Sequence, residues 1–140
     1  MRTRLAQRID AAPQAAYLAV MGLVYVLVGF TWVLIPSVGR IEGIDWIPAL
    51  TPQMVGGAWI VAGTVAATTA TTDSHRLYMA GFFGLQFVAL TLASYFFIAW
   101  LLYLTPLVEG GAKHGLTSAV SYFGFFASAS ITARFPGKER

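Results

Sequence analysis

One uncharged stretch, residues 77–105, limits most strongly what this chain can fold into. It reads LYMAGFFGLQFVALTLASYFFIAWLLYLT and contains no Asp, Glu, Lys, Arg or His. A helix needs about 20 apolar residues to cross the hydrocarbon core of a bilayer, so the stretch predicts a transmembrane helix. At about 1.5 Å per residue it is roughly 40 Å long, and we therefore expect it to tilt or to protrude.

Three further apolar runs accompany it. Together they predict spans at 14–35, 54–71, 77–104 and 116–133, joined by outer loops at 36–53 and 105–115 and by a short turn at 71–76. Only 11% of the residues are charged, against about 25% in soluble domains, and the mean hydropathy is +0.68. We expect an all-α fold: an integral membrane four-helix bundle that forms a single domain over residues 1–140, without a substantial soluble domain.

The positions of the basic residues predict the orientation. The outer loops contain only Arg40 and Lys113, whereas the other basic residues lie in the terminal segments and the 71–76 turn: Arg2, Arg4, Arg8, Arg76, Arg134, Lys138 and Arg140. The positive-inside rule then places both termini in the cytoplasm, N-in and C-in, in a bacterial inner (plasma) membrane. The N-terminal apolar run is too long for a cleavable signal peptide. Charges at the ends of spans also argue against nucleic acid as a partner.

Small residues predict where helices approach closely. In the 54–71 span a stripe is formed by Ala58, Ala62 and Ala66, widened by Gly63, and the 116–133 span has Gly124 and Ser128 four positions apart. Such stripes let helix backbones meet in lipid, either within one chain or between copies.

Two spans also share the pattern G-x-x-aromatic-x-x-x-G. It runs from Gly22 to Gly29 around Tyr25, and again from Gly56 to Gly63 around Trp59. Because consecutive spans point in opposite directions, the match is open to two interpretations: chance, or an inverted repeat. If it is a repeat, Tyr25 and Trp59 stand beside close glycine contacts.

Gln86 is the one strongly polar side chain of the long stretch. It lies roughly 13 Å from the inner end of its span, near the middle of a bilayer core of about 30 Å. An unsatisfied amide costs several kcal/mol there, so we expect Gln86 to form a hydrogen bond across helices. The candidate partners are Thr64, Thr68, Ser121 or a second Gln86. Gln86 is then either a clasp within the bundle or a residue that fixes an oligomer or lines a pore.

Aromatic residues near the ends of spans predict anchors at the membrane interface: Trp32, Trp46, Trp100 and Tyr103. Trp46 lies among isoleucines in the 36–53 loop, which we interpret as a loop anchored in lipid or as a small lid. Asp73 is the expected N-cap of the 77–104 span.

Residues able to carry chemistry are sparse. No Asp, Glu, Lys, Arg or His falls inside a span and the chain has no cysteine, which argues against proton-coupled exporters and thiol enzymes. His75 and His114 are expected on opposite membrane faces, so they cannot ligate one haem or one metal ion. We therefore predict a protein that is not an enzyme and has neither a cofactor nor a metal site.

The span pattern, and the segment TPQMVGGAWIVAGTVAA in particular, resembles small four-span membrane proteins of actinobacterial phages, a holin-like group. The resemblance implies action by helix association in the inner membrane, and no functional residue is carried over from it. The small stripe at Ala58, Ala62, Gly63 and Ala66, with Gln86, would carry that association. The alternatives are an accessory or exclusion protein that binds another membrane protein, and a small transporter or lipid-binding protein. The expected partners are the lipid bilayer and either further copies of the chain or another membrane protein.

Overall fold

The computed structural model describes residues 13–47, 49–72, 74–105 and 111–134, and within these ranges helices are the only regular structure. Four of the helices are long: α2 (Pro13–Leu34), α4 (Pro52–Thr69), α5 (His75–Leu104) and α6 (Gly115–Ala133). The all-α prediction is confirmed, and each long helix begins and ends within two residues of a predicted span.

The connection between α2 and α4 contains a short helix that the sequence analysis did not anticipate, α3 (Val38–Ile44). A proline lies near each end of this connection: Pro36 follows α2 and precedes α3, and Pro52 is the first residue of α4. Thr51 caps α4, because its Oγ1 accepts a hydrogen bond from the Met54 N–H at 3.2 Å. The expected cap Asp73 lies outside the described residues, and Ser74 occupies the N-cap position of α5.

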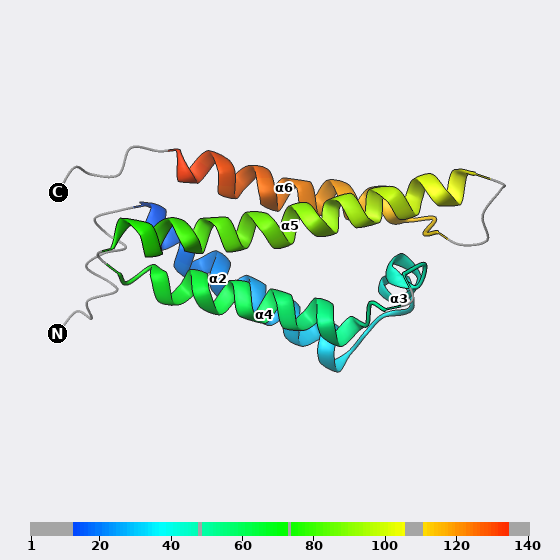
Figure 1. Ribbon diagram of the computed structural model, residues 1–140, viewed down its shortest axis with the longest axis horizontal. Helices are drawn as coiled ribbons and strands as arrows, with labels where there is room; N and C mark the ends of the chain where they lie inside the picture. The colour runs from blue at the N-terminus through cyan, green and yellow to red at the C-terminus, as the bar shows by residue number, and fades with distance from the viewer. Residues whose placement is uncertain (1–12, 48, 73, 106–110, 135–140) are drawn as a thin grey trace.

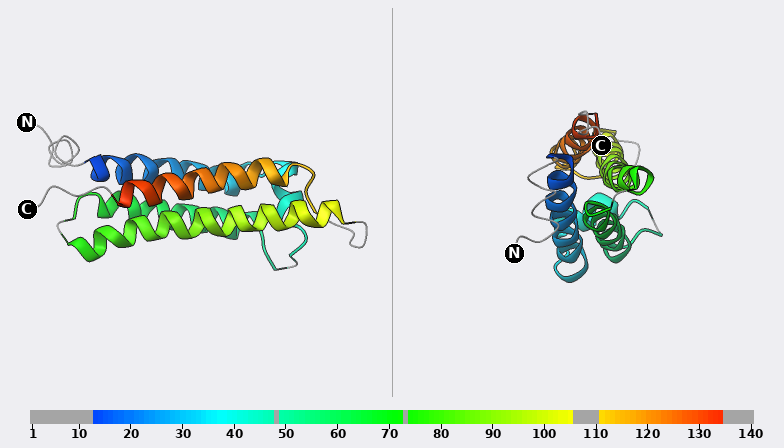
Figure 2. Two further views of the ribbon diagram at one scale, coloured as in Figure 1. Left: turned by 90° about the horizontal axis from the view of Figure 1, so that it is seen from above. Right: turned by 90° about the vertical axis from the view of Figure 1, so that its left-hand side faces the viewer.

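The long helices form two antiparallel pairs, α2 with α4 and α5 with α6 (Figures 1 and 2). Helix α2 begins and α6 ends at one end of the bundle, which we call the termini end. The two pairs lie close together there and diverge toward the opposite end, where α3 lies between them (Figure 1). We call this opposite end the α3 end.

Three of the helices, α2, α5 and α6, are long and apolar enough to cross a membrane. Helix α4 is not among them, although it matches the predicted 54–71 span in position. Its composition explains the difference, because it begins with Pro52 and Gln53 and is otherwise rich in glycine, alanine and threonine.

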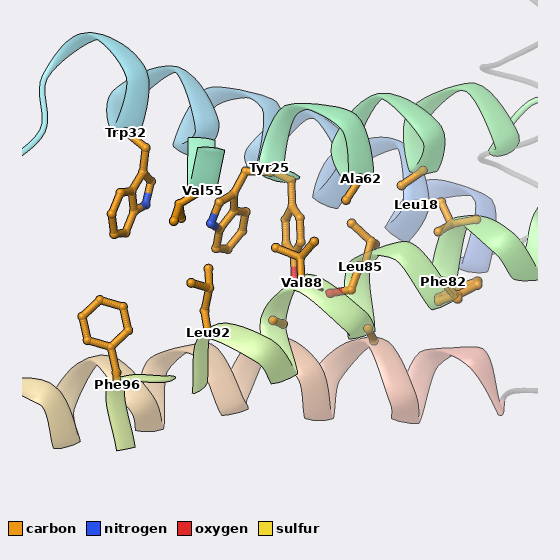
Figure 3. Packing of buried hydrophobic residues seen from close by; sticks show 14 of the residues in the cluster. Leu18, Tyr25, Trp32, Val55, Ala62, Phe82, Leu85, Val88, Leu92 and Phe96 are labelled. Carbon is orange, nitrogen blue, oxygen red and sulfur yellow. Dashed lines mark hydrogen bonds between the residues drawn. The ribbon is translucent and has the colours of Figure 1, made fainter. Parts of the chain in front are cut away.

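Large aromatic side chains fill the space between the two pairs. Trp32, Tyr25 and Trp59 are completely buried, and Phe82 and Phe96 nearly so; Figure 3 shows how the labelled members of this core point inward from α2, α4 and α5. The outside of the bundle is apolar as well, as at Phe83 and Val120, whose exposed fractions are 67% and 64%. An apolar surface this extensive is foreign to soluble monomers, in which exposed apolar patches are small.

Candidate functional site

Glycines bring the backbones of α2 and α4 into contact at two levels. A Cβ atom on Gly63 would lie 2.5 Å from the carbonyl oxygen of Gly22, and one on Gly29 would lie 2.7 Å from the carbonyl oxygen of Gly56. Both distances are shorter than ordinary van der Waals contact. Only glycine fits at these four positions, and we call them the glycine seam.

Tyr25 and Trp59 lie between the two levels of the glycine seam. Their ring centroids are 4.3 Å apart, with the rings tilted by 56°. The two G-x-x-aromatic-x-x-x-G segments therefore pair with each other in antiparallel fashion, each glycine of one facing a glycine of the other. Two consecutive spans pair in antiparallel fashion whether the match is a repeat or chance, so both interpretations stay open, and in either case the two aromatic residues lie beside close glycine contacts.

The Tyr25–Trp59 pair joins the two helix pairs. Trp59 contacts Tyr122 and Phe125 of α6, with ring centroids 5.7 and 6.4 Å away. The Tyr25 hydroxyl donates a hydrogen bond of 3.1 Å to the backbone carbonyl of Leu85 in α5. This hydrogen bond satisfies the only polar atom of a fully buried side chain.

Helices α2 and α6 are linked by hydrogen bonds at the termini end. The hydroxyls of Tyr17 and Ser128 lie 2.7 Å apart, and the Gln14 side-chain amide donates to the carbonyl of Thr132 at 3.3 Å. Ser128, predicted as part of a small stripe, thus packs within the chain.

Toward the α3 end, two buried indole groups lack hydrogen-bond partners. Among the described residues, the Nε1–H groups of Trp32 and Trp59 form no hydrogen bond of good geometry, although both side chains are completely buried and the Tyr122 side chain lies near the Trp32 indole. The prediction of Trp32 as an interface anchor is wrong, because the side chain lies in the core, with the Arg40 guanidinium 5.2 Å from its ring centre. Burying a donor without an acceptor costs about 1–3 kcal/mol.

The other predicted anchors lie at the surface or close to it. Trp46 is half-buried and packs on Tyr95 of α5, with ring centroids 5.3 Å apart. Trp100 is also half-buried, beside Phe97, whereas Tyr103 is exposed. The 36–53 connection therefore covers the α3 end through Trp46 and through Ile44, which is buried.

An apolar pocket of about 120 Å³ lies between α4 and α5, and we call it the α4–α5 slot. Its lining includes the side chains of Met54, Val55, Ala58, Val88, Leu92 and Tyr95. Met54 and Ala58 are exposed, so the slot opens on the surface, whereas Val55 and Leu92 form a buried floor. Leu50 covers it on the side of the α2–α4 connection. The alternative of a small transporter or lipid-binding protein predicts a polar or apolar cavity among the 54–71, 77–104 and 116–133 spans, and the slot lies between the first two of these, but its lining residues were not predicted.

Gln86 lies near the middle of α5 and is half-buried. Within the described ranges, its amide forms no hydrogen bond with another residue. The predicted partners are engaged elsewhere: Thr64 donates to the Ile60 carbonyl, Thr68 to that of Thr64, and Ser121 to that of Thr117. Among the described residues, the predicted clasp between Gln86 and these hydroxyls is not formed, and a second Gln86 stays the untested candidate partner. A hydroxyl bonded to its own helix has no need of a second partner.

The small residues predicted for association divide into two groups. Ala62 and Ala66 are buried inside the chain together with the glycine seam. Ala58 is exposed at the slot, and Gly124 is exposed on α6, where an added Cβ would meet no atom within 4 Å.

Groups able to hold a metal ion do not converge. No three His, Cys, Asp or Glu side chains gather anywhere in the described part of the chain. His75 begins α5 and His114 precedes α6, at opposite ends of the bundle. No family model, curated protein or solved structure matches the chain. The function must therefore be inferred from the structure of the chain itself. Three features stand out: the half-buried side chain of Gln86, the α4–α5 slot, and the buried indole groups of Trp32 and Trp59.

Proposed function

We propose that the chain is a multi-pass protein of the bacterial inner membrane that acts without catalysis, by lateral association of its helices, in the manner of a holin. Copies accumulate in the membrane, associate, and at a threshold density open a lesion that collapses the membrane potential. The observation that carries the proposal is the Gln86 amide, which has no hydrogen-bond partner within the described chain.

In this proposal α4 is a fourth crossing helix. It lies antiparallel to α2, an apolar helix long enough to cross, and touches it at both levels of the glycine seam. A helix held along such a neighbour occupies the same depth of the membrane. Its modest hydropathy then reflects the small residues that close contact with α2 requires.

The same proposal places both termini in the cytoplasm. Among the described residues, Arg76 and Arg134 lie at the termini end, whereas Arg40 and Lys113 lie toward the α3 end. The terminal segments add Arg2, Arg4, Arg8, Lys138 and Arg140, and this excess follows the positive-inside rule.

Gln86 supports association because of its depth. An amide in the hydrocarbon core without a partner costs several kcal/mol relative to a satisfied one. A second copy that offers its own Gln86 satisfies both amides, since each has a donor and an acceptor. Hydrogen bonds between membrane helices contribute about 1 kcal/mol, enough to favour one mode of association among several.

Gly124 supports close approach on the neighbouring helix. It lies near the middle of α6, as Gln86 lies near the middle of α5, and the space around it is open. An exposed glycine lets a second helix backbone come close. Ala62, Gly63 and Ala66 are occupied within the chain, so in this proposal association uses Gln86 of α5 and Gly124 of α6 in place of these three residues of α4.

The test is the membrane potential of a bacterial host during induced expression, followed with a voltage-sensitive dye beside a growth curve. We expect a sudden depolarisation with wild type. It is delayed or lost in Gln86→Leu, which removes the amide at similar volume, and in Gly124→Leu. Gly57→Leu is the matched control, because an added Cβ at Gly57 also meets no atom within 4 Å.

A steady potential and normal growth, at membrane amounts that match those of a known lesion-forming protein, overturn the proposal. So does an unchanged depolarisation time in both surface variants. A steady potential combined with a co-purifying membrane protein favours the accessory or exclusion function instead.

A further inference from the structure

One face of α5 carries large apolar residues at intervals of seven, and the chain itself leaves them uncovered. Their exposed fractions lie between 43% and 67%, and they are Phe83, Leu90, Phe97 and Leu104. A second set lies four positions before each of them: Met79, Gln86, Ala93 and Trp100. Positions that alternate in steps of four and three are the a and d positions of a coiled coil, with the second set at a and the first at d. We call these eight residues the heptad face.

Gln86 is the strongly polar member of the heptad face. A single polar residue at an a position specifies the register of a coiled coil and the number of its strands. The Gln86 side chain is half-buried near the middle of α5, and its amide has no hydrogen-bond partner among the described residues. We propose that two copies of the chain pair through their heptad faces, with parallel α5 helices and with hydrogen bonds between the two Gln86 amides. This inference rests on the proposed function and specifies the surface that its first step uses.

The proposed orientation makes this pairing symmetric. Copies that all insert with their termini in the cytoplasm have parallel α5 helices, so the two-fold axis of a pair lies along the membrane normal. Each heptad position of one copy then faces the same position of the other. An amide is both donor and acceptor, so two amides at the same depth satisfy each other. A shift by one heptad sets Gln86 against Met79 or Ala93 and leaves both amides unpaired, which fixes the register.

The spacing also predicts how the two helices cross. A repeat of seven residues is slightly shorter than two turns of a straight helix, so the paired helices wind around each other with a left-handed twist. Crossing angles of about 20° with this hand are common among membrane helices. Ala93 is buried against its own chain and is small, so it leaves room for the large d residues of the second copy. Because lipid is as apolar as these d residues, the amide pair is what favours this contact over others.

This pairing accounts for two copies and no more. A contact in which both copies use the same face is closed once it has formed. Growth from pairs to a lesion therefore needs a second surface, and Gly124 lies on a different helix, where an added Cβ meets no atom within 4 Å. We therefore expect Gly124→Leu to form the α5 pair normally while its depolarisation is delayed.

The test uses single cysteines, because the chain has none of its own. Leu90→Cys and Phe97→Cys are compared with Thr91→Cys and Ile98→Cys, each as full-length protein in phospholipid vesicles oxidised with copper phenanthroline. The control positions are exposed and lie at almost the same depths, but one residue further and so about 100° around the helix. Thr91 lines the α4–α5 slot. We expect disulfide-linked dimers to form about ten-fold faster at the two heptad positions, since a disulfide needs Cα atoms within about 7 Å.

The amide is tested by adding Gln86→Leu to Leu90→Cys. We expect the association constant, from cross-linked fractions over a range of protein-to-lipid ratios, to fall about five-fold, and Gln86→Asn, which keeps an amide, to fall less. Equal cross-linking rates at heptad and control positions, or an unchanged association constant in Gln86→Leu, overturn the inference. The assay needs no lesion. The expected cross-links without depolarisation therefore refute the proposed function alone, and depolarisation without these cross-links refutes the α5 pairing alone.

Discussion

Replacing Gly63 by alanine tests the glycine seam with a single methyl group. The new Cβ would lie 2.5 Å from the Gly22 carbonyl oxygen and 2.8 Å from the Val26 amide nitrogen. Both neighbours are backbone atoms, so neither can move aside as a flexible side chain would. Ordinary contact begins at about 3.4 Å, and α2 and α4 must therefore separate by roughly 1 Å.

The loss of stability can be estimated from the contacts that this separation of α2 and α4 weakens. Overpacking in a dense interior costs about 1–3 kcal/mol, and a gap approaching 1 Å forfeits a quarter to a half of the dispersion energy of each affected contact. The seam has backbone on both sides, so we expect the upper part of the range. Gly57→Ala is the control, because an added Cβ there meets nothing within 4 Å. The helix-propensity gain of about 1 kcal/mol is common to both variants and cancels. We predict that Gly63→Ala is about 3 kcal/mol less stable than Gly57→Ala.

Reversible unfolding in mixed micelles with rising dodecyl sulfate measures this difference. Circular dichroism reports helix loss, and tryptophan fluorescence reports separation of Trp59 from Tyr25, whose ring centroids are 4.3 Å apart in the native bundle. If Gly63→Ala and Gly57→Ala unfold within about 0.5 kcal/mol of each other, α2 and α4 do not meet through glycine and the seam is refuted.

Two further predictions follow from named contacts. Tyr25→Phe removes the 3.1 Å hydrogen bond to the Leu85 carbonyl and is expected to lower the unfolding free energy by about 1 kcal/mol, whereas the exposed Tyr103→Phe changes nothing; equal stabilities would contradict the bond. Because the chain has no cysteine, Lys113→Cys and Arg76→Cys can be labelled in whole cells with an impermeant maleimide. The proposed orientation predicts labelling at position 113 and none at position 76, and the reverse pattern would contradict it.

The positions of the helices could be predicted from the sequence, because their ends are set by local chemistry. Uncharged apolar runs stop at Pro36 and at the 71–76 turn, and each span matches a helix within two residues. The short α3 was not predictable in the same way. At seven residues it is too short for its periodicity to be distinguished from that of an apolar loop.

Which face of each helix packs was harder to predict, for a physical reason. In a soluble bundle the buried face is apolar and the exposed face polar, whereas here both faces are apolar and hydropathy does not separate them. The position of Trp32 near the end of an apolar span therefore predicts a side chain at the membrane interface. In the structure this side chain is buried, and Arg40 of α3 lies over its ring. The spacing of the glycines predicted helix contacts better than hydropathy did. All four glycines of the two matching segments lie where the backbones of α2 and α4 meet: Gly22, Gly29, Gly56 and Gly63.

Of the candidate site, the sequence singled out Gln86 but not its surroundings. Its expected partners Thr64, Thr68 and Ser121 were plausible by depth, yet the direction of each hydroxyl is set by its own helix backbone. The burial of an indole donor could also have been predicted from the sequence. Trp59 is a buried donor in the middle of an apolar segment, and the reasoning applied to Gln86 applies equally to its N–H.

The pairing of α2 with α4, and of α5 with α6, has a consequence for synthesis on the ribosome. The partner of each helix is the next long helix to emerge, so the glycine seam can close before α5 and α6 exist. Contacts between sequence neighbours form quickly, and units of this kind assemble in order during translation. We therefore expect the α2–α4 pair to bring Tyr25 and Trp59 together first, and the hydrogen bond from Tyr25 to Leu85 to form only when α5 and α6 pack against that pair.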